Sequence, residues 1–297
     1  MTVRLRDASE EDAPAICALL EEHALASFGE VELSEEEIRS WFRTPRLWIQ
    51  LAEREGKPVG YLDVRAEDGG RFDVDARTLD SEVASVLVEA AEGHARTKGE
   101  PGLLRGYVQG DEPVLRRAYD AAGWRPIRYS FQMRIELDGE EVPEPVWPDG
   151  LEPRHVREGE EERVYEAHME SFADHWDFRR QSFDEWARYT TDSHRFDPSL
   201  WWLVDEGDEL AAISLNAWHF SGDPTFGWIH VLGVRPAWRR RGLATALLRH
   251  SFRDFEQRGA TRVGLGVDGE NTTGAVRLYE QVGMHQVRRN DTYEKKL

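Results

Sequence analysis

The sequence has a single cysteine, Cys17, among its 297 residues. One cysteine excludes an internal disulfide, a thiolate zinc cluster and a CxxC redox pair, so we interpret Cys17 as a small apolar residue of the first helix. The sequence also lacks an apolar run of about 20 residues that could span a membrane. Its first residues, MTVRLRDASEED, contain no apolar signal segment. We therefore expect a cytoplasmic protein.

Positive charge is scarce as well. The sequence has 57 Asp and Glu residues against 38 Lys and Arg residues, which gives a formal net charge of −19. The resulting field repels phosphate backbones and anionic lipids, so we expect neither a nucleic acid nor a membrane as partner. An acidic surface could attract a cationic acceptor such as an amine, or it could serve solubility alone. With 40% hydrophobic residues, the chain should be globular.

The sequence contains a weak internal repeat. When the chain is shifted by 160 positions, Gly106 falls on Gly266 and Tyr119 falls on Tyr279 without gaps. A repeat of this length indicates two similar domains rather than a solenoid of short units.

The repeat predicts the domain boundaries. We expect each half to close on its own final strand, Phe131–Leu137 in the first half and Asp291–Leu297 in the second. The stretch between the halves is acidic and rich in proline, which favours a stiff linker over a helix or strand. We therefore predict domains over residues 1–137 and 150–297, joined by a linker over residues 138–149.

The second half alternates between helical and strand patterns. Helical periodicity, a capping box and β-rich runs predict an α/β architecture with a mixed sheet covered by helices. The predicted helices are residues 160–172, a helix beginning near 182, 241–257 and 273–282, and the predicted strands are 201–205, 210–218, 225–234, 262–267 and 293–297.

The most informative segment is VLGVRPAWRRRGLATALL, residues 231–248, in which a strand leads through a basic turn into a helix. A helix start presents unpaired backbone N–H groups and the positive end of the helix dipole, which suits a pyrophosphate. Gly242 and Ala244 would let phosphates approach the backbone, and Arg239, Arg240 and Arg241 would add positive charge. A solvated basic helix start is the alternative interpretation.

Together with the later segment VDGENTTGAVRLYEQVGM, this turn resembles the GNAT superfamily of acyl-CoA-dependent N-acyltransferases. The resemblance covers residues 149–297 and, more weakly, residues 1–137. It implies two tandem GNAT-like α/β domains, each a mixed, mostly antiparallel twisted sheet flanked by helices, as in two-domain acetyltransferases of bacteria. It also implies acetyl-CoA as co-substrate and no metal.

The resemblance implies a set of cofactor-binding residues. The strand before the turn should splay from its neighbour to admit the pantetheine arm of the cofactor, which would pair with the backbone. Asn271 matches the family's cofactor-contacting asparagine, and Tyr279 matches its tyrosine near the thioester sulfur. The pantetheine-pairing residues would be Leu232, Gly233 and Val234, and the residues around the pyrophosphate would be Arg239, Arg240, Arg241, Gly242, Leu243, Ala244 and Thr245.

Acetyl transfer to an amine needs a proton donor for the leaving thiolate and a base for the ammonium. Tyr279 can donate, because an unperturbed tyrosine with a pKa of about 10 stays protonated at neutral pH; the alternative is that it packs in the core. His230 is the candidate base, because strand alternation places it on one face with Trp228, Leu232 and Val234. A structural histidine is the alternative for His230.

The acceptor site is less well defined by the sequence. Asp174 and His175 fall between the first two helices of the second half, the region that lines the acceptor pocket in similar proteins. We predict these two residues, with Trp228, as acceptor-binding residues.

The first half has the wrong charges for the same chemistry. The shift of 160 positions places Asp80 opposite Arg240, Glu82 opposite Gly242, and Asp111 opposite Asn271. Carboxylates at this turn repel phosphates. We therefore predict a first domain with the same fold that does not bind CoA, and that supports the second domain or shapes its acceptor cleft.

These inferences predict an N-acetyltransferase that moves acetyl from acetyl-CoA to a primary amine of a small molecule by direct attack in a ternary complex. The alternatives are a protein N-terminal or lysine acetyltransferase, and a non-catalytic acyl-CoA-binding regulator. We expect a monomer or a homodimer. The identity of the acceptor does not follow from the sequence.

Overall fold

The structure is a computed structural model of the chain. It describes residues 2–31, 33–98, 102–139, 141–148, 150–193, 195–220, 222–271 and 273–297. Met1 and Asp149, where the predicted first domain begins and the predicted linker ends, lie outside the described residues. The chain forms two compact units. Unit 1 contains Met1–Phe131, Phe220–Gly222 and Arg288–Leu297, and unit 2 contains Gln132–His219 and Asp223–Val287.

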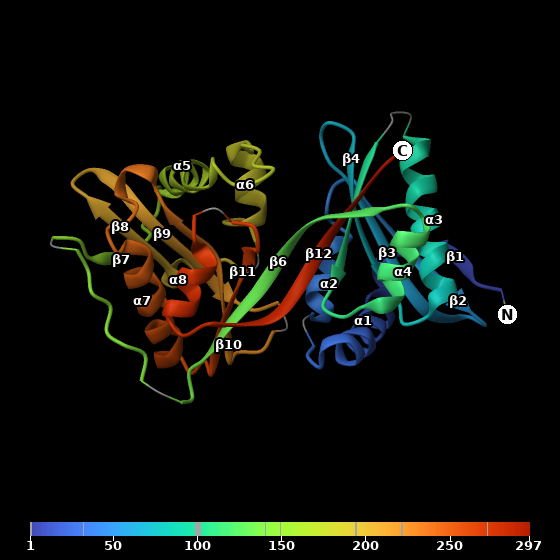
Figure 1. Cartoon of the computed structure of the whole chain (residues 1–297), viewed down its shortest axis with the longest axis horizontal. Coiled ribbons are helices and arrows are strands. Elements are labelled where there is room, and N and C mark those ends of the chain that lie inside the picture. Colours follow the sequence, from blue (N-terminus) through green and yellow to red (C-terminus); the bar gives the residue numbers. More distant parts are fainter. Residues whose placement is uncertain are drawn as a thin grey trace. The chain divides into compact units, whose positions relative to one another are not determined.

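Unit 1 is a mixed sheet with helices on both faces (Figure 1). Its strands run in the order β1-β2-β3-β4-β5-β12, and only the β4–β5 pair is parallel. Helices α1 and α2 pack on one face, over Leu51 and Tyr61, while α3 covers the other face, over Leu62 and Val74. The elements of the first half are β1 (Arg4–Asp7), α1 (Ala13–Phe28), α2 (Glu35–Trp41), β2 (Leu47–Arg54), β3 (Lys57–Ala66), β4 (Arg71–Arg77), α3 (Ser81–Thr97), β5 (Leu103–Gln109), α4 (Pro113–Ala121) and β6 (Arg125–Glu136).

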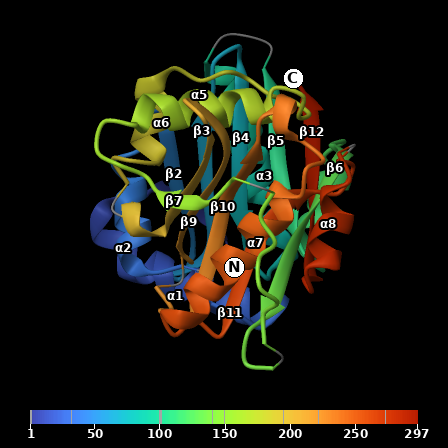
Figure 2. The same cartoon turned by 90° about the vertical axis from the view of Figure 1, so that its left-hand side faces the viewer.

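Unit 2 repeats this plan with strands in the order β6-β11-β10-β9-β8-β7 (Figure 2). Apart from the parallel β10–β11 pair, β10–β9, β9–β8 and β8–β7 are antiparallel, which confirms the predicted mixed, mostly antiparallel α/β sheets. The elements of the second half are β7 (Pro153–His155), α5 (Glu161–Phe172), α6 (Phe183–Tyr189), β8 (Trp201–Glu206), β9 (Glu209–Trp218), β10 (Phe226–Val234), α7 (Leu243–Gln257), β11 (Arg262–Asp268), α8 (Ala275–Gln281) and β12 (His285–Lys296).

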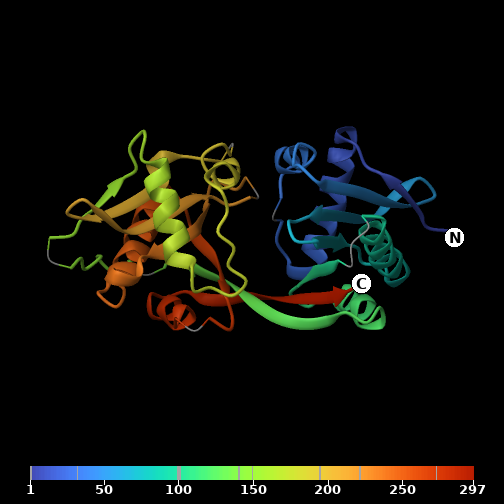
Figure 3. The same ribbon diagram turned by 90° about the horizontal axis from the view of Figure 1, so that it is seen from above.

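The two halves exchange their final strands, which the repeat does not predict. Strand β12, from the end of the chain, pairs with β5 of unit 1, with Tyr293 opposite Gly106 (Figure 3). Strand β6, from the first half, lies next to β11 in unit 2, where the N–H of Leu137 donates to the carbonyl of Thr261 over 2.7 Å. The expectation that each half closes on its own strand is therefore wrong.

Side-chain contacts explain the exchange. Tyr293 is buried in the unit 1 core, 5.4 Å from the ring of Tyr119. Charged residues of β12 also find their partners in unit 1, since Glu294 pairs with Arg105 over 2.5 Å. The two final strands are related by the repeat, so sequence similarity alone does not tell which sheet each one joins.

The segment between the halves is anchored to unit 2. Residues 141–148 form neither helix nor strand, as predicted for a linker. Val142 is nevertheless buried, and its carbonyl accepts a hydrogen bond of 2.8 Å from Arg253 of α7. Trp147 packs edge-on against His250 of the same helix. Within the described parts of the chain, no helix is long and apolar enough to cross a membrane.

Candidate active site

Strands β10 and β11 splay apart, as the resemblance implied. β10 follows β9 to Val234, but it pairs with β11 only from Phe226 to Trp228, opposite Arg262 to Gly264. Farther along β11, Gly266 is exposed, and a Cβ added there would have no heavy atom within 4 Å. The sheet face over Gly266 is therefore open.

A bulge in β10 changes which side chains share a face. The register with β9 shifts between Ile229 and Val231, so His230 is the inserted residue. Leu232 and Val234 consequently pack toward α7, in a cluster with Leu243 and Leu247.

Trp228 lies on the opposite face, because its ring would meet a Cβ on Gly264 at 2.6 Å, whereas the neighbouring Gly227 faces Phe255 of α7. His230 lies on the Trp228 side, where Arg195 and His219 act on it electrostatically. The prediction that Trp228, His230, Leu232 and Val234 share one face is wrong, because a bulge reverses the alternation of side chains.

His230 is accessible to solvent, yet protein surrounds its ring closely. Burial lowers the pKa of His230 to about 3, helped by the positive charges of Arg195 and His219. The imidazole is therefore neutral at pH 7 and can accept a hydrogen bond, but it is a weak base.

The turn after β10 ends in a helix start without a side-chain cap. Gly242 is the N-cap of α7 and has a φ of 90°, a left-handed conformation that glycine adopts without strain. It has no side chain to accept from the first N–H groups of the helix, which belong to Leu243, Ala244 and Thr245. Unpaired N–H groups at a helix start, together with the positive end of the helix dipole, can bind an anion.

Most of the positive charge in this turn is neutralised. Arg239 forms an ion pair with Asp174 over 2.6 Å, and Arg241 forms one with Glu206 over 2.5 Å. Among the described residues, Arg240 alone of these three arginines has no ion pair or hydrogen bond, and its φ of 62° places it in the left-handed region. Of the three arginines that we expected to add positive charge to the turn, only Arg240 lacks a counter-charge among the described residues.

Tyr279 lies buried on α8, and burial raises its pKa to about 12. Its hydroxyl has no hydrogen-bond partner within the described part of the chain. Asn271 lies in the loop before α8, where its Oδ1 accepts from the N–H of Thr273 over 2.7 Å.

Asp174 and His175, which we predicted as acceptor-binding residues, lie in different electrostatic environments. The carboxylate of Asp174 accepts two hydrogen bonds from Arg239, which lower the pKa of Asp174. Its proposed contact with an acceptor amine stays a prediction. His175 is half-buried; burial lowers its pKa, while the charges of Asp174 and Asp268 oppose this shift. Asp268, the last residue of β11, lies within the segment VDGENTTGAVRLYEQVGM but was not predicted as a site residue.

In unit 1 the corresponding helix start is capped by an aspartate side chain. Asp80 is the N-cap of α3, and its carboxylate accepts from the N–H groups of Glu82 and Val83 over 2.9 and 3.2 Å. It also pairs with Arg54 over 2.7 Å. When the two helices are aligned at their N-caps, Asp80 rather than Glu82 is the counterpart of Gly242. The shift of 160 positions is therefore wrong by two residues at this point.

The tyrosine position of unit 1 is also closed. Tyr119 is fully buried, and a Cβ on Gly106 would lie 2.6 Å from its Cζ atom. Trp124 packs against the same ring at 4.5 Å. Tyr119 is therefore a core residue, while the space beside Gly266 in unit 2 stays open.

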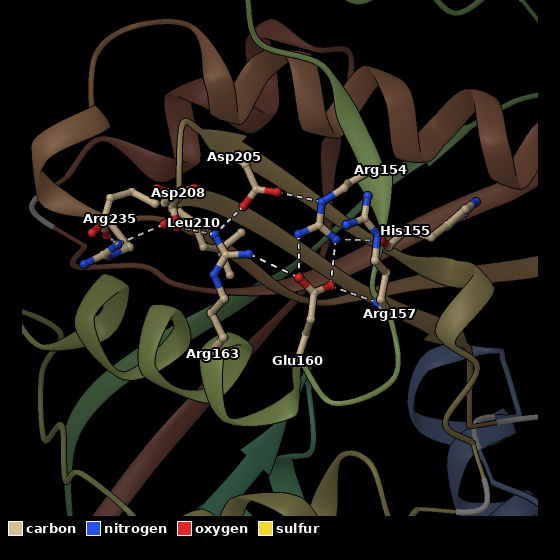
Figure 4. Close-up of polar contacts among 10 residues, drawn as sticks. Arg154, His155, Arg157, Glu160, Arg163, Asp205, Asp208, Leu210 and Arg235 are labelled. Atoms are coloured by element: carbon tan, nitrogen blue, oxygen red, sulfur yellow. Dashed lines mark hydrogen bonds and ion pairs between the residues drawn. The ribbon is translucent and has the colours of Figure 1, made fainter.

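A network of ion pairs supports the other end of α5 (Figure 4). Arg154 of β7 binds Glu160, just before α5, and Asp205 of β8 over 2.7 and 2.6 Å. Arg163 of α5 also binds Asp205, over 2.7 Å. These bonds fix the helix whose C-terminal end carries the acceptor-side residues, and no spacing in the sequence reveals them.

Comparisons with known proteins identify the family of this chain. Residues 161–284 match the acetyltransferase (GNAT) family. Mycothiol acetyltransferase of Streptomyces avermitilis is 29% identical over 296 residues, covering 93% of this chain and 89% of that protein. The crystal structure of a GCN5-related N-acetyltransferase from Sphaerobacter thermophilus is 30% identical with a TM-score of 0.83, covering 99% of this chain and 95% of that one.

A tandem GNAT protein from the clavulanic acid biosynthesis pathway has the same fold, with a TM-score of 0.81 at 14% identity over 99% of this chain and 98% of that one. The fold and the matches therefore define a tandem GNAT protein. The chain belongs to the GNAT acetyltransferase family and is an acetyl-CoA-dependent acetyltransferase.

Proposed function

We propose that this enzyme transfers acetyl from acetyl-CoA to the primary amine of a small molecule, by direct attack in a ternary complex formed in unit 2. The observation that carries the proposal is the uncapped start of α7, which follows the splayed strand β10 after a turn over residues 235–242. The similarity to mycothiol acetyltransferase supports a small-molecule acceptor.

In this proposal the pyrophosphate binds the N–H groups at the start of α7, with Arg240 as the charged side chain. Gly242 and Ala244 keep the approach to the backbone clear. The pantetheine arm lies in the splay and pairs with the backbone of residues 232–234, beside the open space at Gly266. Asn271 keeps its proposed contact with the cofactor.

In this proposal Tyr279 and His230 carry the chemistry. The amine attacks the thioester carbon, the carbonyl oxygen gains negative charge, and the C–S bond breaks to release the CoA thiolate. Tyr279 donates its unused proton to this thiolate, because its raised pKa keeps it protonated. His230 accepts a hydrogen bond from the attacking nitrogen and receives its proton once the positively charged tetrahedral intermediate makes that proton acidic.

Unit 1 serves as a support without a cofactor site in this proposal. The carboxylate of Asp80 occupies the N–H groups that a phosphate would need, and Tyr119 fills the space that stays open in unit 2. The proposed cofactor domain lies within residues 150–297, with β6 completing its sheet.

The test is a thiol-release assay with acetyl-CoA and two sets of acceptors. One set contains amino sugars and amino acid amides, and the other contains peptides with a free N-terminus or an internal lysine. Release of CoA that depends on a small amine and yields its N-acetyl product is the expected result. Turnover with the peptides alone would favour a protein acetyltransferase, and failure of the chain to bind acetyl-CoA would contradict the proposal.

A further inference from the structure

The side chain of Arg239 bridges three parts of unit 2. Nη1 and Nη2 donate to the two carboxylate oxygens of Asp174 over 2.6 and 3.1 Å. Nη2 also donates to the carbonyl of Ser171, in the last turn of α5, over 3.0 Å, and Nε donates to the carbonyl of Val234, at the end of β10, over 3.2 Å. All three guanidinium nitrogens are thus bonded to protein acceptors.

These bonds use four of the five N–H donors of the Arg239 side chain and leave one Nη1 hydrogen for any other partner. A single exposed ion pair contributes little to stability, and Asp174 is half-exposed. The bidentate geometry and the two carbonyl acceptors make this contact different, because a planar guanidinium fixes several groups at once. The arginine also places a positive charge at the C-terminal end of α5, where the helix dipole favours it.

A second arginine repeats the connection. Arg235, at the start of the same turn, binds Glu170 of α5 over 2.6 Å and Glu209 of β9 over 2.8 Å. The C-terminal end of α5 is therefore attached to the turn by two arginines. The segment that follows, residues 173–182, runs from α5 to α6 and carries Asp174 and His175; we name it the acceptor segment.

We infer that Arg239 is a positioning residue that attaches the acceptor segment to the phosphate-binding turn, so that binding of acetyl-CoA at the turn also orders the acceptor segment. The inference rests on the proposed function for the identity of the ligand. Its physical basis is that the backbone of Arg239 lies within the turn while its side chain holds Asp174 and the end of α5. Immobilising the turn therefore restricts the segment.

The test combines calorimetric titration with acetyl-CoA and hydrogen exchange of the acceptor segment. In Asp174→Ala we expect the Kd for acetyl-CoA to change by less than about threefold, while the segment in the free protein exchanges at least about fivefold faster. Acetyl-CoA should protect the segment in the wild type and not in Asp174→Ala. Arg239→Lys keeps the charge but loses the three-way contact. Acetyl-CoA should therefore protect the segment less in this variant than in the wild type.

Arg240→Gln is the matched control in the same turn. It should raise the Kd by about tenfold and leave exchange of the acceptor segment in the free protein unchanged. Thermal unfolding of each variant establishes that it is folded.

Two results would overturn the inference. One is unchanged exchange of the segment in Asp174→Ala. The other is a loss of affinity in Arg239→Gln as large as in Arg240→Gln but absent in Asp174→Ala, since this would make Arg239 a phosphate ligand. If the wild type binds no acetyl-CoA, the proposed function fails instead, and exchange in the free variants still decides whether the link exists.

Discussion

The two helix starts provide a direct test of the cofactor site. Gly242, at the start of α7, leaves the first N–H groups uncapped, whereas Asp80 caps those of α3 with its carboxylate. Replacing Gly242 by Asp should place a like charge beside the proposed pyrophosphate. A Cβ at this position meets no heavy atom within 4 Å, so the new side chain has room.

The expected magnitude follows from the charge. Two unit charges of the same sign at about 4 Å repel by about 4 kcal/mol at an effective dielectric constant of about 20, which raises the Kd for acetyl-CoA by about 10³-fold. Gly242→Asn is the control, because it is nearly the same size and is neutral. The left-handed backbone is accessible to both Asn and Asp, so both variants should fold with a similar strain of about 1 kcal/mol.

The assay is calorimetric titration with acetyl-CoA at low and at physiological ionic strength, with thermal unfolding as the folding control. We expect the Asp variant to bind at least about 100-fold more weakly than the Asn variant at low salt, and the difference to shrink as salt screens the charge. Equal affinity of the two variants within about threefold would refute the placement of a phosphate at this helix start.

Three further predictions concern the chemistry and the exchanged strands. Tyr279→Phe should lower the rate of acetyl transfer by about 10²-fold in the thiol-release assay with the Kd for acetyl-CoA unchanged, and an unaffected rate across pH would remove Tyr279 as the proton donor. Because the pKa of His230 is lowered to about 3 from its ordinary 6.5, the unfolded chain binds the proton more strongly, so His230 makes stability fall as the pH drops from 6.5 toward 3; urea unfolding should show a smaller fall in His230→Gln, and an equal fall would contradict the assignment. Tyr293→Ala should reduce the free energy of unfolding by about 3 kcal/mol, because it empties the unit 1 core beside Tyr119, and a loss below about 1 kcal/mol in urea unfolding would contradict the role of β12.

The strand–turn–helix motif could be predicted because its determinants are local. Gly242 and Ala244 lie within one turn of each other, and the apolar periodicity of the helix that follows needs no partner to be recognised. The structure confirms the predicted element order of the second half and the splay of β10 from β11. Turn and helix chemistry of this kind is encoded in neighbouring residues.

The features that could not be predicted depend on contacts between distant residues. The bulge at His230 is set by the register with β9, so alternation alone misplaced Leu232 and Val234. Arg239 and Asp174 are 65 positions apart, and only the fold shows that the arginine binds the carboxylate instead of adding charge to the turn.

The exchange of β6 and β12 was hidden for a different reason. The repeat makes the two final strands resemble each other, and pairing is decided by partners such as Arg105 and Glu294 across the sheet. The repeat did predict that the first half has a carboxylate at the phosphate turn. The structure identifies Asp80 as that carboxylate.

The central claim is that one of two similar units binds acetyl-CoA. Calorimetric titration of the purified chain with acetyl-CoA measures the number of sites directly. The account predicts one site per chain, lost in Gly242→Asp and retained in Asp80→Asn. Two sites in the wild type, or a single site that survives Gly242→Asp and disappears in Asp80→Asn, would contradict it.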